Sequence, residues 1–395
     1  MSQAPSSSRR FPTSSGRPQP QPNCPGICPG YGGHLDAFER AFAQQCGTAH
    51  CVGVGNGLDA LTLALRALGV GPDDEVIVPA FTFIATWFSV SHVGARPVPV
   101  DVRHDGNIDP DRIAAAVTRR TRAIVPVHLF GHLADMEAIL DVASRFGLPV
   151  VEDAAQAHGA ERLGRRAGSF GTLSAFSFYP TKNLGALGDG GAVCTSDAML
   201  AAAVRSLRNY GSATKNRHDV LGHNSRLDDL QAAFLSVKLP GLDAANDSRR
   251  NLAGRYHDVF SALPGFACPG PGDNSMVWHQ FVLRSDARDS LQARLALEGV
   301  GTAIHYPVAP FDQPCYAASY DSAQFPIASE LASTVISLPM ADYLTELEIC
   351  HVLQAGIRAA SQGWLGLIRK YPNRVACDRP VCGFPLLEEF VIPFG

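Results

Sequence analysis

The sequence between residues 34 and 200 alternates regularly between short apolar runs and stretches with helical periodicity. The apolar runs are rich in Val and Ile, which is typical of parallel strands that are buried on both faces. Strands are predicted at 50–54, 75–79, 97–100, 123–127, 149–153, 174–179 and 191–195, with helices at 35–45, 58–67, 82–93, 113–117 and 136–146. This pattern predicts an α/β domain built on a mainly parallel seven-stranded sheet that helices cover on both faces.

The pattern changes after residue 196, where helical segments dominate to about residue 263, including a long helical stretch at 228–263. A smaller α+β unit is predicted from strands at 279–283 and 302–304 and helices at 290–298 and 344–360. We therefore expect a disordered tail at 1–30, a large α/β domain at 31–240, a small α+β domain at 241–360 and a divergent tail at 361–395.

Charge and cysteine content exclude several classes of protein. The net charge is −4 and the isoelectric point is near 6.3, so we expect no nucleic-acid partner and no binding to an anionic membrane. The uncharged stretch 76–95 is as long as a bilayer span, but its Pro, Thr, Ser and His residues favour a buried strand, turn and helix. The close pairs Cys24/Cys28 and Cys377/Cys382 have no second pair nearby, so we expect no metal site and a cytoplasmic protein with reduced thiols.

A glycine-rich segment, Gly-Val-Gly-Asn-Gly at 53–57, connects the first predicted strand to the next helix. Backbone N–H groups at such a turn, together with the positive end of the helix dipole, bind phosphate. A nicotinamide-binding fingerprint would need a third glycine where this chain has Leu58, and an acid at the end of the next strand. Asp73, Asp74 and Glu75 precede that strand instead. The segment therefore indicates a phosphate site and argues against NAD.

Two further segments carry an acid and an amine. Asp153 ends a predicted buried strand, where a carboxylate faces the ligand crevice and needs a cation such as a protonated pyridine nitrogen. Lys182 follows the strand predicted at 174–179 and precedes a glycine-rich loop, where a desolvated lysine can form a Schiff base. A phosphate cradle, a carboxylate and an amine together predict pyridoxal 5′-phosphate as the cofactor, with Lys182 as the proton shuttle.

The segments GNGLDAL (55–61), EDAAQAHG (152–159) and SFYPTKNLG (177–185) resemble the DegT/DnrJ/StrS family of pyridoxal-phosphate-dependent sugar aminotransferases. The resemblance runs from about residue 33 to residue 360. It implies the fold type I architecture and a homodimer whose active sites lie at the subunit interface.

The resemblance also implies which residues hold the cofactor. Lys182 would form the covalent link, and Asp153 would pair with the pyridine nitrogen. The remaining contacts would be Gln156 to the ring hydroxyl, Phe83 on the ring face, and the phosphate contacts Gly57, Leu58, Ser177 and, from the other subunit, Asn224. Many family members have threonine at position 58, so here the backbone amide of Leu58 remains and a hydroxyl contact is lost.

The segments NYGS (209–212), NSRLD (224–228) and LQAA (230–233) resemble enzymes that aminate carbon 3 of dTDP-3-keto-6-deoxyhexoses. That resemblance implies that Tyr179, His305 and Tyr306 approach the sugar and that Lys215 approaches the nucleotide. Arg226 is a candidate for carboxylate or phosphate recognition, or for a surface salt bridge. The predicted reaction moves an amino group from L-glutamate, the family's usual donor, to this nucleotide sugar in deoxyaminosugar or antibiotic biosynthesis.

Four alternatives remain open. Amination could fall on carbon 4 of the sugar. A sugar dehydratase on the same fold would have histidine in place of Lys182. A non-catalytic regulator is possible because residues 18–31 hold Pro, Gln and Cys where family members usually begin with an amphipathic helix. An NAD oxidoreductase is the fourth alternative, and Leu58 counts against it because a nicotinamide-binding fingerprint needs glycine at that position.

Overall fold

The computed structural model describes residues 33–270 and 272–361. The tails predicted at 1–30 and 361–395 lie outside these ranges, apart from residue 361, and so do the two close cysteine pairs. The boundary predicted at residue 240 between a large and a small domain stays a prediction.

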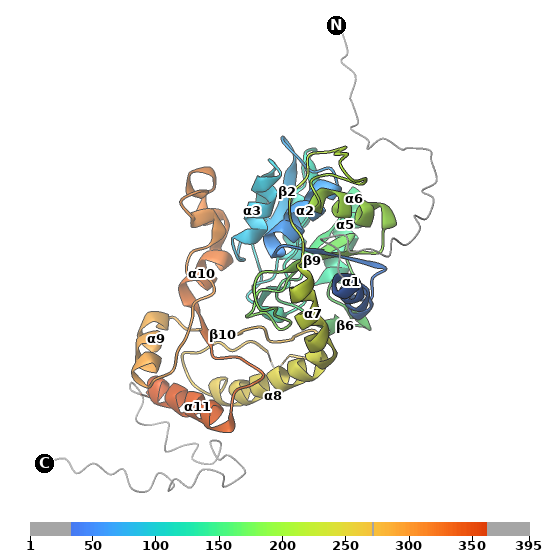
Figure 1. The fold of residues 1–395 in the computed structure, drawn as a ribbon. Coiled ribbons are helices and arrows are strands. Elements are labelled where there is room, and N and C mark those ends of the chain that lie inside the picture. The colour runs from blue at the N-terminus through green and yellow to red at the C-terminus, as the bar shows by residue number, and fades with distance from the viewer. Residues whose placement is uncertain (1–32, 271, 362–395) are drawn as a thin grey trace, which may run out of the picture.

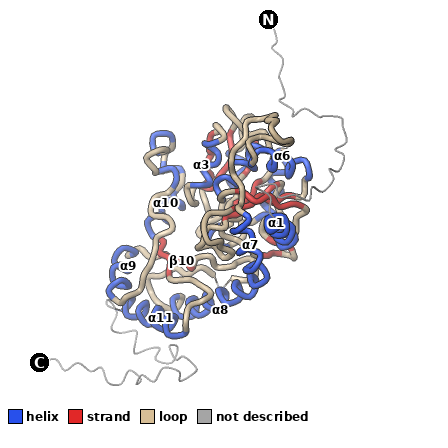
Figure 2. Tube along the Cα trace, in the orientation of Figure 1, coloured by secondary structure: helices blue, strands red, loops and turns tan. Residues whose placement is uncertain are grey.

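The seven predicted strands form a three-stranded and a four-stranded sheet, which isolated bridges connect into what we call the large sheet. The strands are β1 (His50–Val54), β2 (Glu75–Pro79), β3 (Arg96–Val100), β4 (Thr121–Ile124), β5 (Val151–Asp153), β8 (Leu173–Ser177) and β9 (Gly191–Thr195). Figure 1 labels β2 and β9 of this sheet, and Figure 2 shows its strands in red. The order is β3-β2-β4 on one side and β5-β8-β9-β1 on the other, and parallel bridges join Ile124 to Val150 and Val127 to Asp153. Among these strands, β9 pairs antiparallel with β1 and β8, and the other pairs are parallel, which confirms the prediction of a mainly parallel sheet.

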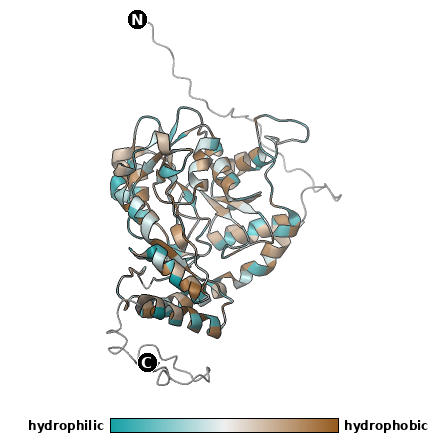
Figure 3. Ribbon diagram, turned by 90° about the vertical axis from the view of Figure 1, so that its left-hand side faces the viewer, coloured by the Kyte–Doolittle hydropathy of each residue, from teal (hydrophilic) through white to brown (hydrophobic). Residues whose placement is uncertain are grey.

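Helices cover both faces of this sheet because successive strand residues point to opposite sides. Val76 and Val78 of β2 belong to one buried cluster and Ile77 belongs to the other. The first cluster includes α2 (Gly57–Ala67), α3 (Ala85–His92) and α6 (Ala198–Arg208), and the second includes α1 (Gly33–Cys46), α4 (Pro110–Ala116), α5 (Met136–Phe146) and α7 (Asp229–Lys238). Figure 3 shows that these helices carry both hydrophobic and hydrophilic residues, as expected for one buried face each.

The helix boundaries follow local sequence signals. Asn56 caps α2 by accepting a hydrogen bond from the Asp59 N–H at 2.8 Å, and Asp135 caps α5 in the same way. Gly147 ends α5 in the left-handed conformation, with φ at 64°. The uncharged stretch 76–95 forms β2, a turn and α3, and none of the described helices has the length and apolar character to cross a bilayer.

The C-terminal part has its own core, formed by α8 (Leu242–Phe260), β10 (Phe281–Arg284), α9 (Arg288–Leu297), β11 (Val335–Leu338) and α11 (Glu346–Ser361). These elements, β11 apart, are labelled together below the large sheet in Figure 1. A short helical turn over Leu239–Gly241, with Pro240 near its start, separates α7 from α8 inside the stretch that we expected to be continuously helical.

Three features of the fold, two of them in this C-terminal part, differ from the predictions. The strand predicted at 302–304 is reduced to a single bridge between Ala303 and Ser337, on the edge of β11 that does not face β10. β11 follows α10 (Pro326–Thr334) directly, without the turn residues that would have marked its start. The short strands β6 (Glu161–Arg162) and β7 (Arg165–Arg166) form a hairpin that was also not predicted.

A buried hydrogen-bond network around Glu152 fixes β5 to the loop that precedes β8. His128 Nε2 lies 2.9 Å from a carboxylate oxygen of Glu152, and both side chains are fully buried. Glu152 also accepts hydrogen bonds from the backbone N–H groups of Gly168, Phe170 and Gly171. His128 Nδ1 accepts from the Ala134 N–H, so the proton of the ring belongs on Nε2, facing Glu152. A carboxylate with this many donors is stable in the core.

Replacing this carboxylate should be costly. Glu152→Ala leaves three backbone N–H groups and His128 without their acceptor, so the free energy of unfolding should fall by about 3–5 kcal/mol. Urea unfolding followed by circular dichroism measures the loss. The control is Glu137→Ala on the exposed face of α5, where the fall should stay within about 1 kcal/mol. Equal losses in the two variants would contradict the proposed anchoring role of Glu152.

Candidate functional site

Asp153 ends β5 at the carboxyl edge of the parallel strands. Its side chain is only 6% exposed. One carboxylate oxygen accepts a hydrogen bond from the Thr86 hydroxyl at 2.8 Å, and the other accepts from the Ala155 N–H at 3.2 Å. Burial raises the pKa of Asp153, while these hydrogen bonds and the positive charge of Lys182 act in the opposite direction. The structure therefore surrounds this carboxylate with groups that favour its charged form.

Lys182 lies in the turn that follows β8, where its N–H donates to the Tyr179 carbonyl at 2.8 Å. Burial lowers the pKa of its amine to about 8, although the negative charge of Asp153 acts to raise it. Each of the two side chains affects the pKa of the other, so they share one site. A lysine with this pKa has a neutral, nucleophilic fraction near physiological pH.

The amino-terminal turn of α2 packs against the end of β8. A Cβ atom added to Gly57 would lie 2.7 Å from the Ser177 Cβ, so only glycine allows this close approach. The Ser177 hydroxyl therefore lies beside the first-turn residues Gly57 and Leu58. Backbone N–H groups at a helix start and a neighbouring hydroxyl are the donors that bind phosphate.

Gln156 and Phe83 meet at Tyr306, which comes from the C-terminal part of the chain. Gln156 donates to the Tyr306 hydroxyl at 3.0 Å, and its own oxygen accepts from the Phe130 N–H at 2.6 Å. The rings of Phe83 and Tyr306 are 5.5 Å apart, and Phe83 remains 52% exposed. Burial raises the pKa of Tyr306, so its phenol keeps its proton. Phe83 thus offers an open aromatic surface beside a fixed phenol.

His305 is hydrogen-bonded through Nδ1 to the Ser337 hydroxyl at 2.8 Å. Burial lowers its pKa, and the positive charge of Lys182 lowers it further, which places His305 within electrostatic reach of the lysine. The structure therefore gathers most of the predicted site residues in one region: Gly57, Leu58, Phe83, Asp153, Gln156, Ser177, Lys182, His305 and Tyr306.

Four predicted residues are not joined to this group. Tyr179 points its exposed side chain outward at the turn before Lys182. Lys215 and Asn224 are exposed in the segment between α6 and α7. Arg226 donates to the Asn209 side chain at 3.3 Å and lies 5.9 Å from the centre of the Tyr210 ring, so it is held within its own segment. Their expected contacts with substrate or with another subunit stay predictions.

The structure adds residues that the sequence predictions missed. Thr86 holds Asp153, and Asn183 immediately follows Lys182 and makes three side-chain hydrogen bonds. His158 is fully buried beside Phe176, at 5.4 Å between ring centres, and burial lowers its pKa to about 3. Thr86 could have been suspected from its place just after the carboxyl end of β2, and Asn183 from its place next to the lysine.

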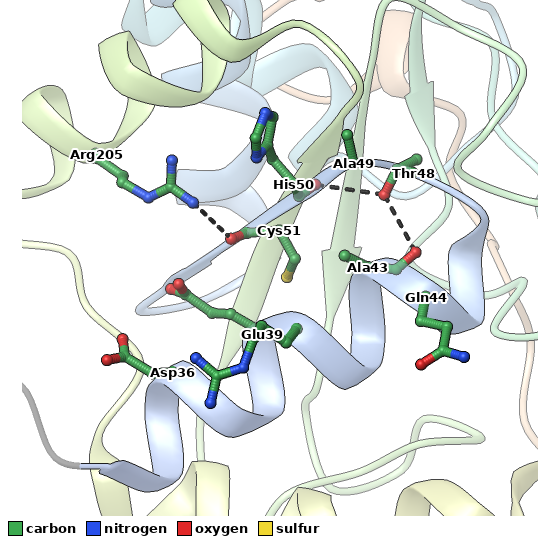
Figure 4. A pocket seen from close by; sticks show the side chains of 10 residues that line it. Asp36, Glu39, Ala43, Gln44, Thr48, Ala49, His50, Cys51 and Arg205 are labelled. Carbon is green, nitrogen blue, oxygen red and sulfur yellow. Dashed lines mark hydrogen bonds between the residues drawn. The ribbon is translucent and has the colours of Figure 1, made fainter. Parts of the chain in front are cut away.

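Two pockets elsewhere in the described residues do not coincide with this site. A pocket of about 610 Å³ lies between α1 and β1, where Arg205 donates to the Cys51 carbonyl at 3.5 Å (Figure 4). A second pocket of about 590 Å³ lies between residues 104–132 and 267–284. Neither is lined by a predicted site residue. Within residues 33–270 and 272–361, no group of three or more His, Cys, Asp and Glu side chains is arranged to bind a metal.

Comparison with known proteins places this site in a family. The model of the DegT/DnrJ/EryC1/StrS aminotransferase family matches residues 28–355. A dTDP-3-amino-3,4,6-trideoxy-alpha-D-glucose transaminase from Streptomyces venezuelae is 49% identical over 327 residues, which cover 82% of this chain and 86% of the relative. The erythromycin biosynthesis sensory transduction protein EryC1 from Saccharopolyspora erythraea is 51% identical over 329 residues, covering 82% and 89%.

A solved structure agrees with these relatives. The crystal structure of S. venezuelae DesV in complex with a ketimine intermediate matches with a TM-score of 0.81 and 48% identity, covering 83% of this chain and 90% of that one. The matches confirm the predicted fold type I α/β architecture and exclude a nicotinamide-binding fold. The chain belongs to the DegT/DnrJ/EryC1/StrS aminotransferase family, whose enzymes work with pyridoxal 5′-phosphate.

Proposed function

We propose that this aminotransferase moves an amino group from L-glutamate to carbon 3 of a dTDP-linked 3-keto-6-deoxyhexose. The observation that carries the proposal is the pairing of the Lys182 amine, whose pKa is lowered to about 8, with the buried Asp153 carboxylate. The substrate class is supported by the S. venezuelae relative, which is named for a dTDP-3-amino sugar.

The residues of the site fit the cofactor. The Gly57 and Leu58 amides and the Ser177 hydroxyl would hold the phosphate, Asp153 the protonated ring nitrogen, Gln156 the ring hydroxyl and Phe83 the ring face. When bound, pyridoxal 5′-phosphate supplies an electron sink for the α-carbon of the amino donor. The Asp153 carboxylate would support that sink, because a negative charge beside the ring nitrogen would favour its protonated form.

Lys182 would act twice in the reaction. Its Nζ atom would hold the resting cofactor, and its free amine would take the α-proton of glutamate during the reaction. A neutral His305 and a protonated Tyr306 would contact the sugar as hydrogen-bonding groups without adding charge. Tyr179 would lie on the sugar side as well.

The nucleotide would meet a basic segment. Lys215 is exposed, and Arg226 presents a planar guanidinium that suits a diphosphate. We also propose a cytoplasmic location, since five of the cysteines that the structure describes are free thiols, as expected in a reducing compartment: Cys46, Cys51, Cys194, Cys268 and Cys315.

We further propose a homodimer formed through the exposed face of α7. Leu230, Phe234 and Val237 recur at helical spacing on this face and are all exposed, and Leu187 is exposed nearby. A contiguous apolar surface of this kind is typical of a protein interface. A partner subunit on this face would allow its Asn224 to reach the phosphate.

The first prediction concerns the covalent link. Borohydride treatment of the holoenzyme should attach a pyridoxyl group to Lys182, as located by peptide mass spectrometry, and Lys182→Ala should abolish both the label and transamination. Glutamate should bleach the visible cofactor band of the wild type. A cofactor band that does not change on addition of glutamate would favour a regulator, a function suggested by the name of the S. erythraea relative.

The position of amination needs a separate experiment. Assays of dTDP-keto sugars with product NMR distinguish amination at carbon 3 from amination at carbon 4.

The second prediction concerns Thr86. Thr86→Val removes the hydroxyl that donates to Asp153, a charge-assisted bond that contributes about 1.5–3 kcal/mol, so cofactor affinity should fall roughly 10–100-fold. Absorbance titration of the apoenzyme with pyridoxal phosphate measures the dissociation constant. Thr86→Ser keeps the donor and should retain near-normal affinity. If the Val and Ser variants bind equally, the hydrogen bond has no role in holding Asp153.

The third prediction tests the interface. Val237→Glu places a charge in the apolar face of α7, where the side chain is 81% exposed in the single chain. The variant should elute as a monomer in size-exclusion chromatography with light scattering at micromolar concentration. Leu297→Glu, at an 89% exposed position on α9, is the control and should remain dimeric. A dimeric Val237→Glu protein would move the interface elsewhere.

A further inference from the structure

The Asn183 side chain makes three hydrogen bonds next to the candidate catalytic lysine, and both of its N–H donors are used. Its nitrogen donates to the Asn246 side-chain oxygen at 2.9 Å and to the Val277 carbonyl at 2.8 Å. Its oxygen lies 3.2 Å from His279 Nδ1, which must therefore carry the proton of that ring. A side chain held in three directions fixes the backbone that carries Lys182.

Asn246 connects the Asn183 side chain to the segment that follows β5. It lies in α8, is 1% exposed, and donates to the His158 carbonyl at 2.9 Å. The chain passes close to it at Gly159, where φ is +82° and an added Cβ would lie 2.9 Å from the Asn246 nitrogen. The pair Asn183–Asn246 thus joins the residue after Lys182 to the segment that holds Asp153 and Gln156.

The segment before β10 joins the same two sides. Val277 accepts from Asn183, and its N–H donates to the Gly131 carbonyl at 2.9 Å. Phe130, the neighbour of Gly131, donates to the Gln156 side chain. Arg249 of α8 in turn donates to the Trp278 carbonyl at 3.2 Å. This segment therefore contacts both the residue that follows Lys182 and the residues that hold Gln156.

The loop after β8 has other anchors, so Asn183 is not needed to keep it folded. Lys238 donates to the Gly185 carbonyl at 2.6 Å, and Gln231 accepts from the Leu187 N–H at 2.9 Å. The two anchored residues, Gly185 and Leu187, follow Asn183 in the loop. Loss of the Asn183 side chain would leave these anchors in place and free the backbone mainly at Lys182.

We propose that Asn183 and Asn246 form a positioning pair that sets the place of the Lys182 amine relative to Asp153. The pair acts through Lys182 and touches no substrate. The proposal rests on the catalytic role proposed for Lys182. Because a displacement of about 1 Å can cost roughly 100-fold in rate, loosening this pair should slow proton transfer far more than it weakens donor binding.

The test compares Asn183→Ala, Asn246→Ala and the double variant as holoenzymes. Stopped-flow bleaching of the cofactor band by glutamate should slow about 10–100-fold in each single variant, with the apparent dissociation constant for glutamate changed less than about 3-fold. The pH midpoint of the visible band should shift, because the Lys182 nitrogen has moved relative to Asp153. The double variant should be slowed by less than the product of the two single effects.

Ser248→Ala is the matched control, since Ser248 lies two residues from Asn246 in α8 and its exposed hydroxyl bonds only to the Ala244 carbonyl among the described residues. It should bleach at the wild-type rate. Unchanged bleaching and an unchanged midpoint in Asn183→Ala would overturn the proposal, even if its melting temperature falls. Should Asn183→Ala fail to fold, Asn246→Ala carries the same test.

Borohydride labelling separates this proposal from the one on which it rests. A pyridoxyl label on Lys182 in the wild type and the variants, together with slowed bleaching, supports the positioning role. A wild-type protein that takes no label on Lys182 refutes the proposed catalytic lysine. A normal label with normal bleaching in both single variants refutes the positioning pair alone.

Discussion

The site depends on one electrostatic constraint, the burial of the Asp153 carboxylate at the end of β5. A charged group in this position needs a cation and hydrogen-bond donors. The structure supplies Thr86 from α3, the Ala155 amide from its own segment, and Lys182 from the loop after β8. The parallel register between β5 and β8, which sets Asp153 opposite Ala175, brings the two loops to the same edge of the sheet.

The C-terminal part completes this edge and is itself held against the large sheet. His305 and Tyr306 reach the site, and the chain then continues over α3, where Tyr316 and Tyr320 pack on Trp87 at 5.2 and 5.1 Å between ring centres. The Tyr316 hydroxyl lies 2.6 Å from the Ser91 hydroxyl. Because α3 also carries Thr86, the helix that supports Asp153 is fixed from the sheet side and from the C-terminal side.

The sequence allowed the large sheet to be predicted because its strands are short apolar runs that alternate with helical stretches. The prediction missed β11, a four-residue strand that directly follows α10. It also gave a strand at 302–304, because the local sequence does not show which strand such a segment pairs with. The site shows the same division. Asp153 and Ser177 end strands, Lys182 follows one, and all three were predictable. By contrast, Asn246 and Val277 contact Asn183 across 63 and 94 residues of sequence. Such contacts depend on tertiary packing that no local pattern records.

The lowered pKa of Lys182 also has a consequence for the newly made chain. An amine that is partly neutral near physiological pH reacts with acylating agents and with small aldehydes as well as with its proper partner. Its position in a half-buried loop restricts access but does not remove the intrinsic reactivity. Early loading with the vitamin-derived coenzyme would therefore protect this nitrogen from chemical damage as well as prepare it for turnover.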